Sequence, residues 1–363
     1  MRRVFGVIVA SLLAGAFMRA QSATPFKLGT FDRGGRTFVG IVLRESVVID
    51  FAAAHQAIRT PVSTLAAPVD LKDLIVQYES GLRSRIVEVI RSVEGSGPTR
   101  LAYVYDLASV KVLPPIMYPT TMLNVAVNYA AHDQEMAQLR AQVPGMGAAT
   151  SGAALPGTRS APGIWERASD DVRWNPYMFM KSPAAIIGDG DAIRLPPGRT
   201  QVDWECELGV VVARQATRVP VARSADYIFG YTLQNDVSDR AGRGDTRYGS
   251  DWLISKNHDT FAPLGPFITP KEFIADPQKL TVRFVLNGQV MQEASTSLMI
   301  HSVFEQISYA SNIMTLRPGD IIATGTPAGV GSARTPPVYF KPGDRSVCTY
   351  EGVGTLTNSV VGS

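Results

Sequence analysis

The chain has 363 residues, of which 45% are hydrophobic and 18% charged, and its formal net charge is +3. This composition is that of a globular protein with a sizeable core, and the length favours two domains. The charge is spread along the chain without a basic block, which argues against nucleic acid as a partner. Two cysteines, Cys206 and Cys348, are too few for a disulfide scaffold, so we expect Cys206 to be a buried structural thiol.

The first 22 residues have the layout of a secretory signal peptide. Arg2 and Arg3 precede a short apolar stretch over residues 4–17, and small residues up to Ser22 suit cleavage by signal peptidase. The apolar stretch is too short to span a bilayer comfortably. The general secretory route is favoured, although the arginine pair also fits the twin-arginine route. We therefore expect a periplasmic or secreted protein without a stable membrane anchor.

Residues 23–118 predict a small N-terminal α+β domain. Strand patterns cover residues 37–43 and 46–51, and apolar residues at helical spacing follow over 70–78 and 82–93. A proline cluster near residue 115 then marks a domain boundary.

Residues 119–363 change character. Short strands rich in valine and isoleucine alternate with turn residues, and helices are expected only around 130–142, 222–227 and 302–313. This pattern predicts a mostly β domain of roll or sandwich type rather than a parallel doubly wound sheet. The stretch 142–170 is rich in Gly, Ala, Ser and Pro, and is either a functional lid or a mobile loop.

His132 and Glu135 lie three residues apart, on one face of the helix expected near residue 130. A carboxylate beside an imidazole raises its basicity and fixes its tautomer, as a general base for water requires. The alternative is a surface helix with a fortuitous pair.

Glu205 and Glu207 precede and begin an apolar run that predicts a strand. Residues two apart in a strand point to the same face, where two carboxylates repel each other. A bound divalent cation would offset that repulsion. The alternative is a solvated polar face at the start of the strand.

Three further segments carry polar residues with two interpretations each. Asp236 follows an apolar strand and either projects into a site or forms an Asx turn. Lys256, before a Pro/Gly turn, is either a surface residue or a cation directed at a carbonyl oxygen. The Gly-rich segment 318–331 lacks the lysine and helix of a phosphate-binding loop, but its N–H groups and threonines could bind a carboxylate.

In this order the motifs resemble the fumarylacetoacetate hydrolase family over roughly residues 119–361. The matching segments are Asn128-Tyr129 with His132 and Glu135, Phe179-Met180-Lys181, Asp203-Trp204-Glu205-Cys206-Glu207, Gly230-Tyr231-Thr232, Asn235-Asp236-Val237-Ser238, Lys256, Asn287-Gly288 with Gln292, Pro318-Gly319-Asp320 and Thr324-Gly325-Thr326-Pro327.

The resemblance implies a mixed β-roll, usually a homodimer, with a divalent metal held by Glu205, Glu207 and Asp236. Three carboxylates form an all-oxygen site, which suits Mg²⁺ or Mn²⁺ and disfavours zinc. The fold class that follows is α+β, mostly β, with a fumarylacetoacetate hydrolase-type roll after the small N-terminal domain.

The resemblance also implies the catalytic roles. His132 and Glu135 would activate water from a lid that closes over the substrate, and Lys256 would stabilise the developing oxyanion. The substrate's oxygens would be contacted by Lys181, Arg240 and Thr326.

Two departures from the family pattern concern the substrate. Asp239 stands where the family commonly has alanine, and Arg243 stands where it has a glutamine that orients the substrate. The 142–170 segment is also longer than the usual lid segment. We expect Arg243 to contact a more anionic or longer substrate, and the insertion to reshape the mouth of the site.

These features predict a metal-dependent hydrolase that cleaves a carbon–carbon bond in an acylpyruvate-like or β-diketone acid. The alternative on the same metal site is an isomerase or decarboxylase of a 2-hydroxymuconate-type or oxaloacetate-like acid. A third interpretation is a non-catalytic periplasmic binding protein. In each case the ligand is a small keto or enol acid.

Overall fold

A computed structural model describes residues 24–60, 65–97, 101–141, 161, 163–165, 168, 170–243 and 251–363. The expected signal peptide, residues 1–22, lies outside the described residues, as does most of the 142–170 segment. In the described part of the chain, no helix has both the length and the apolar composition needed to cross a membrane.

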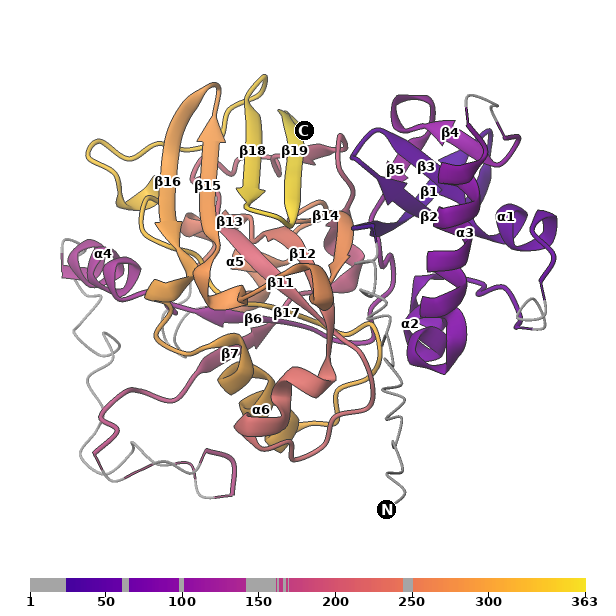
Figure 1. Cartoon of the computed structure of the whole chain (residues 1–363). Coiled ribbons are helices and arrows are strands. Elements are labelled where there is room, and N and C mark those ends of the chain that lie inside the picture. The colour runs from indigo at the N-terminus through magenta and orange to yellow at the C-terminus, as the bar shows by residue number, and fades with distance from the viewer. Residues whose placement is uncertain are drawn as a thin grey trace, which may run out of the picture.

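The described residues of the N-terminal part form five strands and three α-helices (Figure 1). Its elements are β1 (Lys27–Arg33), β2 (Arg36–Leu43), β3 (Val47–Asp50), α1 (Phe51–Ala57), α2 (Leu71–Gln77), α3 (Arg83–Gly95), β4 (Val104–Asp106) and β5 (Lys111–Leu113). The β1–β2 hairpin closes through Gly34 and Gly35, whose φ angles of 63° and 83° suit a two-residue turn. Helix α2 begins where expected because the Asp70 side chain accepts the Asp73 N–H at 2.8 Å.

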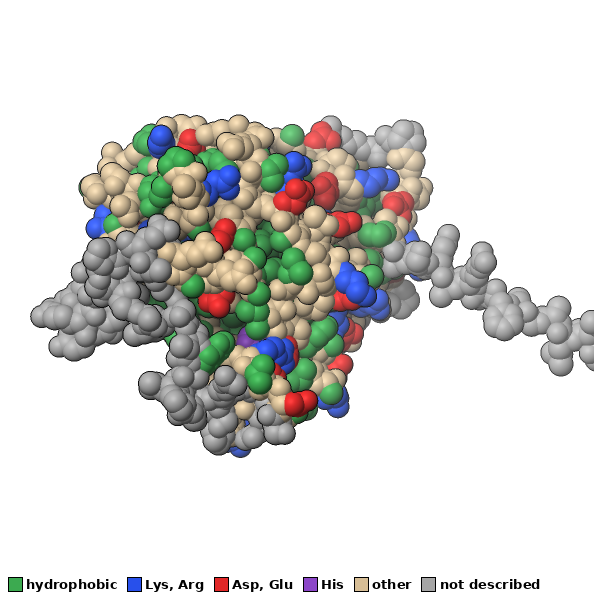
Figure 2. All heavy atoms as spheres, turned by 90° about the vertical axis from the view of Figure 1, so that its left-hand side faces the viewer, with side chains coloured by type: hydrophobic (Ala, Val, Ile, Leu, Met, Phe, Trp, Pro, Cys, Tyr) green, Lys and Arg blue, Asp and Glu red, His purple; other side chains and the backbone are tan. Residues whose placement is uncertain are grey.

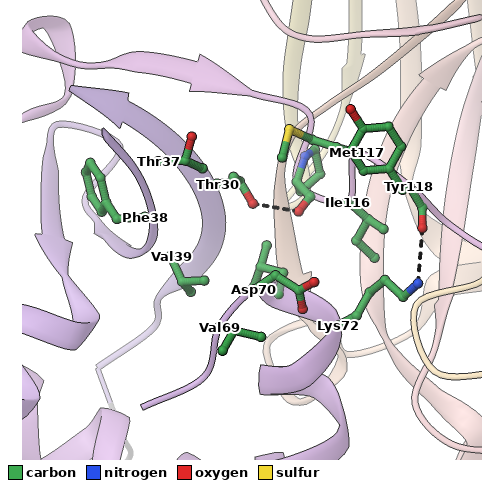
Figure 3. A pocket seen from close by; sticks show the side chains of 12 residues that line it. Thr30, Thr37, Phe38, Val39, Val69, Asp70, Lys72, Ile116, Met117 and Tyr118 are labelled. Atoms are coloured by element: carbon green, nitrogen blue, oxygen red, sulfur yellow. Dashed lines mark hydrogen bonds between the residues drawn. The ribbon is translucent and has the colours of Figure 1, made fainter. Parts of the chain in front are cut away.

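The connection to the second part lies against the N-terminal strands. Residues 115–118 border a pocket together with β1, β2 and the start of α2 (Figure 3). Thr30 Oγ1 donates to the Pro115 carbonyl at 2.8 Å, and Lys72 Nζ donates to the Tyr118 carbonyl at 3.1 Å. These two bonds attach the connection to the N-terminal part.

The second part of the chain is built on two mixed sheets, which confirms the expected mostly β fold. It contributes to the larger sheet β6 (Met122–Ala126), β7 (Tyr177–Met180), β8 (Ile186–Ile187), β11 (Cys206–Val212), β12 (Ile228–Asn235), β14 (Ala262–Pro270) and β17 (Ile321–Ala323). This 12-stranded sheet has the order β4-β3-β2-β1-β14-β12-β11-β17-β6-β7, with β5 beside β1 and β8 beside β14. The β1–β14 pair therefore continues the N-terminal strands into the main sheet.

The second sheet has five strands in the order β16-β15-β18-β19-β9. They are β9 (Ala192–Arg194), β15 (Thr281–Leu286), β16 (Gln289–Ser295), β18 (Arg345–Tyr350) and β19 (Gly354–Val361). A short ladder of β10 (Val202–Asp203) and β13 (Ser238–Asp239) lies beside the ends of β11 and β12.

Within the described residues of this second part, three α-helices accompany the sheets. They are α4 (Ala130–Ala141), α5 (Trp252–Lys256) and α6 (Val303–Ile313). The expected helices near 130 and 302 match α4 and α6, and α6 begins with a capping box between Ser302 and Glu305. The helix expected at 222–227 is a 3₁₀ helix, Val221–Tyr227.

A buried core lies between the two sheets, where Trp204 stacks on Phe284 with ring centroids 5.2 Å apart. The expectation that Cys206 is a thiol is wrong, although its burial is confirmed, because Cys206 of β11 forms a disulfide with Cys348 of β18. The two cysteines are 142 residues apart in the sequence. They meet only because β11 and β18 face each other across the core, and no local pattern reveals that.

Candidate active site

Three buried carboxylates lie together at one end of the β11–β12 pair. Glu205 directly precedes β11 and Glu207 lies within it, two residues on, so the two side chains share a face as the strand period predicts. Pairing of Cys206 with Asn235 brings Asp236 beside Glu205, and the Asp236 N–H donates to the Glu205 carbonyl at 2.8 Å. One carboxylate oxygen from each residue lies within 4.8 Å of the others. The structure therefore assembles the predicted ligand set.

Two buried lysines bind these carboxylates. Lys256, the last residue of α5, donates Nζ to Glu205 Oε2 at 3.0 Å and to Asp236 Oδ2 at 2.7 Å. Lys181, directly after β7, pairs with Asp236 Oδ1 and donates to the Val237 carbonyl at 2.9 Å. Lys181 is only 1% exposed, so protein encloses its ammonium group. Its predicted contact with substrate stays a prediction.

Arg240 is held in place by two acidic side chains. Its Nη2 donates to Glu205 Oε1 at 2.7 Å, and its Nε donates to Asp203 Oδ1 at 2.6 Å. Asp203 in turn accepts the Ser332 N–H at 2.7 Å. Asp203 belongs to the matched motif, but its sequence context gave no signal of this bridging role. The side chain of Arg243 lies outside the described part of the chain.

The environment shifts the pKa values of Glu205 and Glu207 in opposite directions. Burial raises the pKa of Glu207 well above its usual range, and the nearby charges of Asp236 and Glu205 raise it further. Burial also acts most strongly to raise the pKa of Glu205, but the nearby positive groups, Lys256 and Arg240 foremost, together outweigh burial and keep that pKa below its usual value. Burial lowers the pKa of Lys181 to about 8 against the opposing effect of Asp236. Of these two glutamates, Glu207 is therefore the one whose negative charge is less well offset by nearby positive groups.

The donor set fits a hard divalent cation. Three carboxylate oxygens converge on one point, and oxygen is the donor that Mg²⁺ and Mn²⁺ prefer. A cation at this point would also offset the repulsion that raises the pKa of Glu207. The three residues can thus hold a divalent cation.

The predicted base pair lies on α4. His132 Nδ1 is 3.3 Å from Glu135 Oε2, and the two carboxylate oxygens of Glu135 accept the Gly329 N–H at 2.9 and 3.1 Å. His132 is 3% exposed and lies close enough to Glu205 for its charge to act on that carboxyl group. Figure 2 views the molecule from the α4 side, where positively and negatively charged side chains lie among hydrophobic ones. The structure therefore brings the base pair to the carboxylates.

The Gly-rich loop after β17 borders the same centre. The Gly325 N–H donates to Glu207 Oε2 at 3.0 Å. Thr326 Oγ1 donates to the Cys206 carbonyl at 3.2 Å and accepts from Gln292 Nε2 at 2.8 Å. Gln292 appears in the matched motif, but the sequence did not indicate that it joins this loop to β11.

Asp239, which stands where the family commonly has alanine, is buried and paired within the protein. Its carboxylate forms an ion pair with Arg199 and accepts the Ala241 N–H at 3.1 Å. Asp239 therefore stabilises the start of the segment that follows β13. Its predicted effect on the choice of substrate stays a prediction.

Residues 121–361 match the family model described as fumarylacetoacetate (FAA) hydrolase C-terminal. The structure resembles 5-carboxymethyl-2-hydroxymuconate delta-isomerase from Mycobacterium smegmatis, with a TM-score of 0.61 and 30% identity, over 93% of this chain and 99% of that chain. It also resembles maleylpyruvate hydrolase from Sphingobium sp. SYK-6, solved in complex with manganese(II) ion and pyruvate. For that structure the TM-score is 0.65 and the identity 27%, over 93% of this chain and 99% of that chain.

The curated relatives correct the expected location. Oxaloacetate tautomerase Fahd2a, mitochondrial, from Rattus norvegicus is 35% identical over 254 residues, which is 70% of each chain. The Bos taurus tautomerase FAHD2A is mitochondrial as well. These relatives overturn the expectation of a periplasmic or secreted protein, whose only basis, residues 1–22, lies outside the described residues.

The matched range contains the carboxylates and the base pair, and the similar solved structures include an isomerase and a hydrolase. The mixed β fold agrees with these structures, and an enzyme is favoured over the non-catalytic binding protein considered from the sequence. The resemblance seen in the motifs is confirmed: the chain belongs to the fumarylacetoacetate hydrolase family.

Proposed function

We propose that this protein hydrolyses a carbon–carbon bond in an acylpyruvate-like or β-diketone acid. The observation that carries the proposal is the His132–Glu135 pair, with Glu135 Oε2 at 3.3 Å from His132 Nδ1 and the imidazole near enough to Glu205 to act on that carboxyl group. A general base must be oriented and within reach of the water that it activates. The Gly329 N–H holds Glu135, and Glu135 orients the imidazole, so the pair is arranged to take a proton from water.

The other residues supply charge stabilisation. A bound Mg²⁺ or Mn²⁺ would polarise the substrate's oxygens as a Lewis acid and favour an enolate leaving group. Lys256 Nζ, fixed between Glu205 and Asp236, can donate a hydrogen bond to an oxygen that gains negative charge. The proposed substrate contacts are Lys181, Arg240, Arg243 and Thr326.

A second candidate is keto–enol tautomerisation or isomerisation of an oxaloacetate-like or hydroxymuconate-type acid. It is favoured by the names of the relatives, a mitochondrial oxaloacetate tautomerase and a hydroxymuconate delta-isomerase. This chemistry uses the same stabilised enolate, and His132 would move a proton between carbon and oxygen instead of activating water. Decarboxylation of an oxaloacetate-like acid belongs to the same group.

The test is a panel of acylpyruvates, cyclic β-diketones, oxaloacetate and hydroxymuconates with Mg²⁺ or Mn²⁺ in ¹⁸O-labelled water. Hydrolysis places ¹⁸O in the carboxylate of the released acid, and His132→Gln should abolish this incorporation because no base remains to activate water. Loss of enol absorbance without cleavage or ¹⁸O in the product would reject hydrolysis in favour of tautomerisation. A decarboxylation that persists in His132→Gln would indicate that the metal alone suffices.

We also propose that the protein is a homodimer. Tyr177 and Met180 of β7, the last strand of the large sheet, are 54% and 58% exposed, and Leu253 of α5 is 73% exposed. Exposed apolar side chains at the edge of a sheet are typical of an interface. Light scattering should give twice the chain mass of 39.1 kDa, and a monomer at micromolar concentration would contradict the proposal.

A further inference from the structure

Cys206, the residue between two of the proposed metal ligands, is covalently bonded to the second sheet. Its Sγ forms the disulfide with Cys348 of β18. Because side chains alternate along a strand, Cys206 points away from the face that carries Glu205 and Glu207. Both cysteines are buried in the core between the sheets. The disulfide therefore connects the carboxylate strand to the opposite sheet at the position of the carboxylates.

The backbone of Cys206 is also held in place, by hydrogen bonds to its N–H and its carbonyl. Its N–H donates to Gln292 Oε1 at 3.2 Å, and its carbonyl accepts Thr326 Oγ1 at 3.2 Å and the Tyr350 hydroxyl at 3.3 Å. Gln292 Nε2 also donates to Thr326 Oγ1 at 2.8 Å and to the Pro327 carbonyl at 2.7 Å. One buried side chain thus joins β11, β16 and the Gly-rich loop.

We propose that the Cys206–Cys348 disulfide and the Gln292 side chain are positioning groups for metal binding. They fix the peptide units on either side of Cys206. In this way they set the distance between the Glu205 and Glu207 carboxylates and the direction in which both point. Both glutamates are bonded directly to Cys206, so a rotation of its backbone turns the two carboxylates together. Groups that orient metal ligands typically change metal affinity by about 10- to 100-fold. The inference rests on the metal site of the proposed function, and not on the identity of the substrate.

Cys348→Ala tests the disulfide without changing a ligand. The variant removes the bond and leaves Cys206 in place, so the Mn²⁺ dissociation constant of the metal-depleted full chain should rise by about 10-fold. Calorimetric titration measures this constant, and the electron paramagnetic resonance of bound Mn²⁺ should broaden as its ligands lose their fixed arrangement. Unchanged Mn²⁺ affinity would show that the disulfide only links the sheets, and would overturn the proposal.

Leu356→Ala is the matched control. Leu356 is 1% exposed and lies opposite Cys348 in the β18–β19 ladder. This variant should lower the thermal unfolding temperature because it opens a cavity, but it should leave the Mn²⁺ dissociation constant unchanged. An equal loss of Mn²⁺ affinity in Leu356→Ala would mean that general destabilisation explains the effect, and would also reject the proposal.

Chemical reduction reaches the same state if Cys348→Ala folds poorly. A dithiol reductant transfers two electrons and two protons to the disulfide, which yields two thiols and a cyclic disulfide of the reductant. After the reductant has been removed and the thiols counted, the native protein should bind Mn²⁺ about 10-fold more weakly than before reduction. Full affinity after complete reduction would refute the inference.

A double-mutant cycle tests whether the two groups act on the same peptide. Gln292→Met removes the hydrogen bonds and should also weaken Mn²⁺ binding. Combined with Cys348→Ala, it should weaken binding by less than the product of the two effects, and independent effects would contradict a shared action. No substrate enters these titrations. If the variants show this pattern of Mn²⁺ affinities but the hydrolase assay fails, only the proposed reaction is rejected. If the native chain does not bind Mn²⁺, the inference is rejected.

Discussion

Gly329→Ala should slow catalysis by disturbing the contact between α4 and the Gly-rich loop. Gly329 has a φ angle of 106°, and a Cβ at this position would lie 2.1 Å from the carbonyl oxygen of Met291. Because Met291 belongs to β16, its carbonyl cannot yield easily, and the loop must shift instead. The Gly329 N–H would then move away from the two Glu135 oxygens that accept it at 2.9 and 3.1 Å.

The size of the effect follows from this hydrogen bond. A bond to a charged acceptor contributes about 1.5–3 kcal/mol. If Glu135 loses that restraint while it orients His132, the turnover rate falls by roughly 10- to 100-fold. The left-handed backbone adds a cost of about 1–2 kcal/mol to the folded state of the variant, which lowers stability but does not act on the base pair. Any rise in the dissociation constant for Mn²⁺ should be smaller than the fall in turnover rate, because the added Cβ lies 3.2 Å from Gln292 Cγ but meets no carboxylate ligand directly.

The assay is the turnover rate with the best substrate of the panel, followed by enol absorbance, together with the thermal unfolding temperature. Gly343→Ala is the matched control, since Gly343 has a φ angle of 94° and no atom lies within 4 Å of its added Cβ. It should lose comparable stability and keep its turnover rate. An unchanged rate in Gly329→Ala, or an equal rate loss in Gly343→Ala, would refute the reasoning.

Two predictions concern stability. Lys181→Met leaves the buried Asp236 carboxylate without one of its ammonium partners, and urea unfolding should show a loss of about 3–5 kcal/mol. A loss smaller than about 1 kcal/mol would indicate that Lys256 alone offsets this charge. Burial lowers the pKa of His301 to about 4, so the unfolded chain takes up this proton at higher pH than the folded protein, and stability falls as the pH drops from 6.5 toward 4. Between pH 7 and 5 the native protein should lose roughly 2 kcal/mol more unfolding free energy than His301→Gln, and equal losses would contradict the assignment.

Local periodicity explains why part of the site was predictable from the sequence. Glu205 and Glu207 share a face because a strand repeats every two residues, and His132 and Glu135 meet because they lie three apart on a helix. Asp236 reaches the pair only through the register of β11 with β12, so it was assigned by family resemblance and not by a local pattern.

Contacts between distant strands explain what the sequence did not reveal. The Cys206–Cys348 disulfide joins two sheets across 142 residues, and the motif around Gln292 shows no sign of its bonds to Cys206 and the Gly-rich loop. Lys181 illustrates a further limit. A motif can indicate that a lysine belongs to the site, but only the packing of β7 shows that its ammonium group is enclosed against Asp236.

Hydrolysis and tautomerisation depend differently on two parts of this site, the carboxylates and the His132–Glu135 pair, which different elements hold in place. In the proposed mechanism, enolate stabilisation would depend on the carboxylates at the ends of β11 and β12, whereas delivery of water would depend on His132 and Glu135 of α4, which the Gly329 N–H contacts. A disturbance of that restraint acts directly on Glu135, and on the carboxylates only through Gln292. Gly329→Ala should therefore reduce carbon–carbon bond hydrolysis more strongly than interconversion of the keto and enol forms of oxaloacetate. Equal losses in both reactions would instead mean that His132 moves the proton in each, and that α4 is an acid–base element of the enolate chemistry itself.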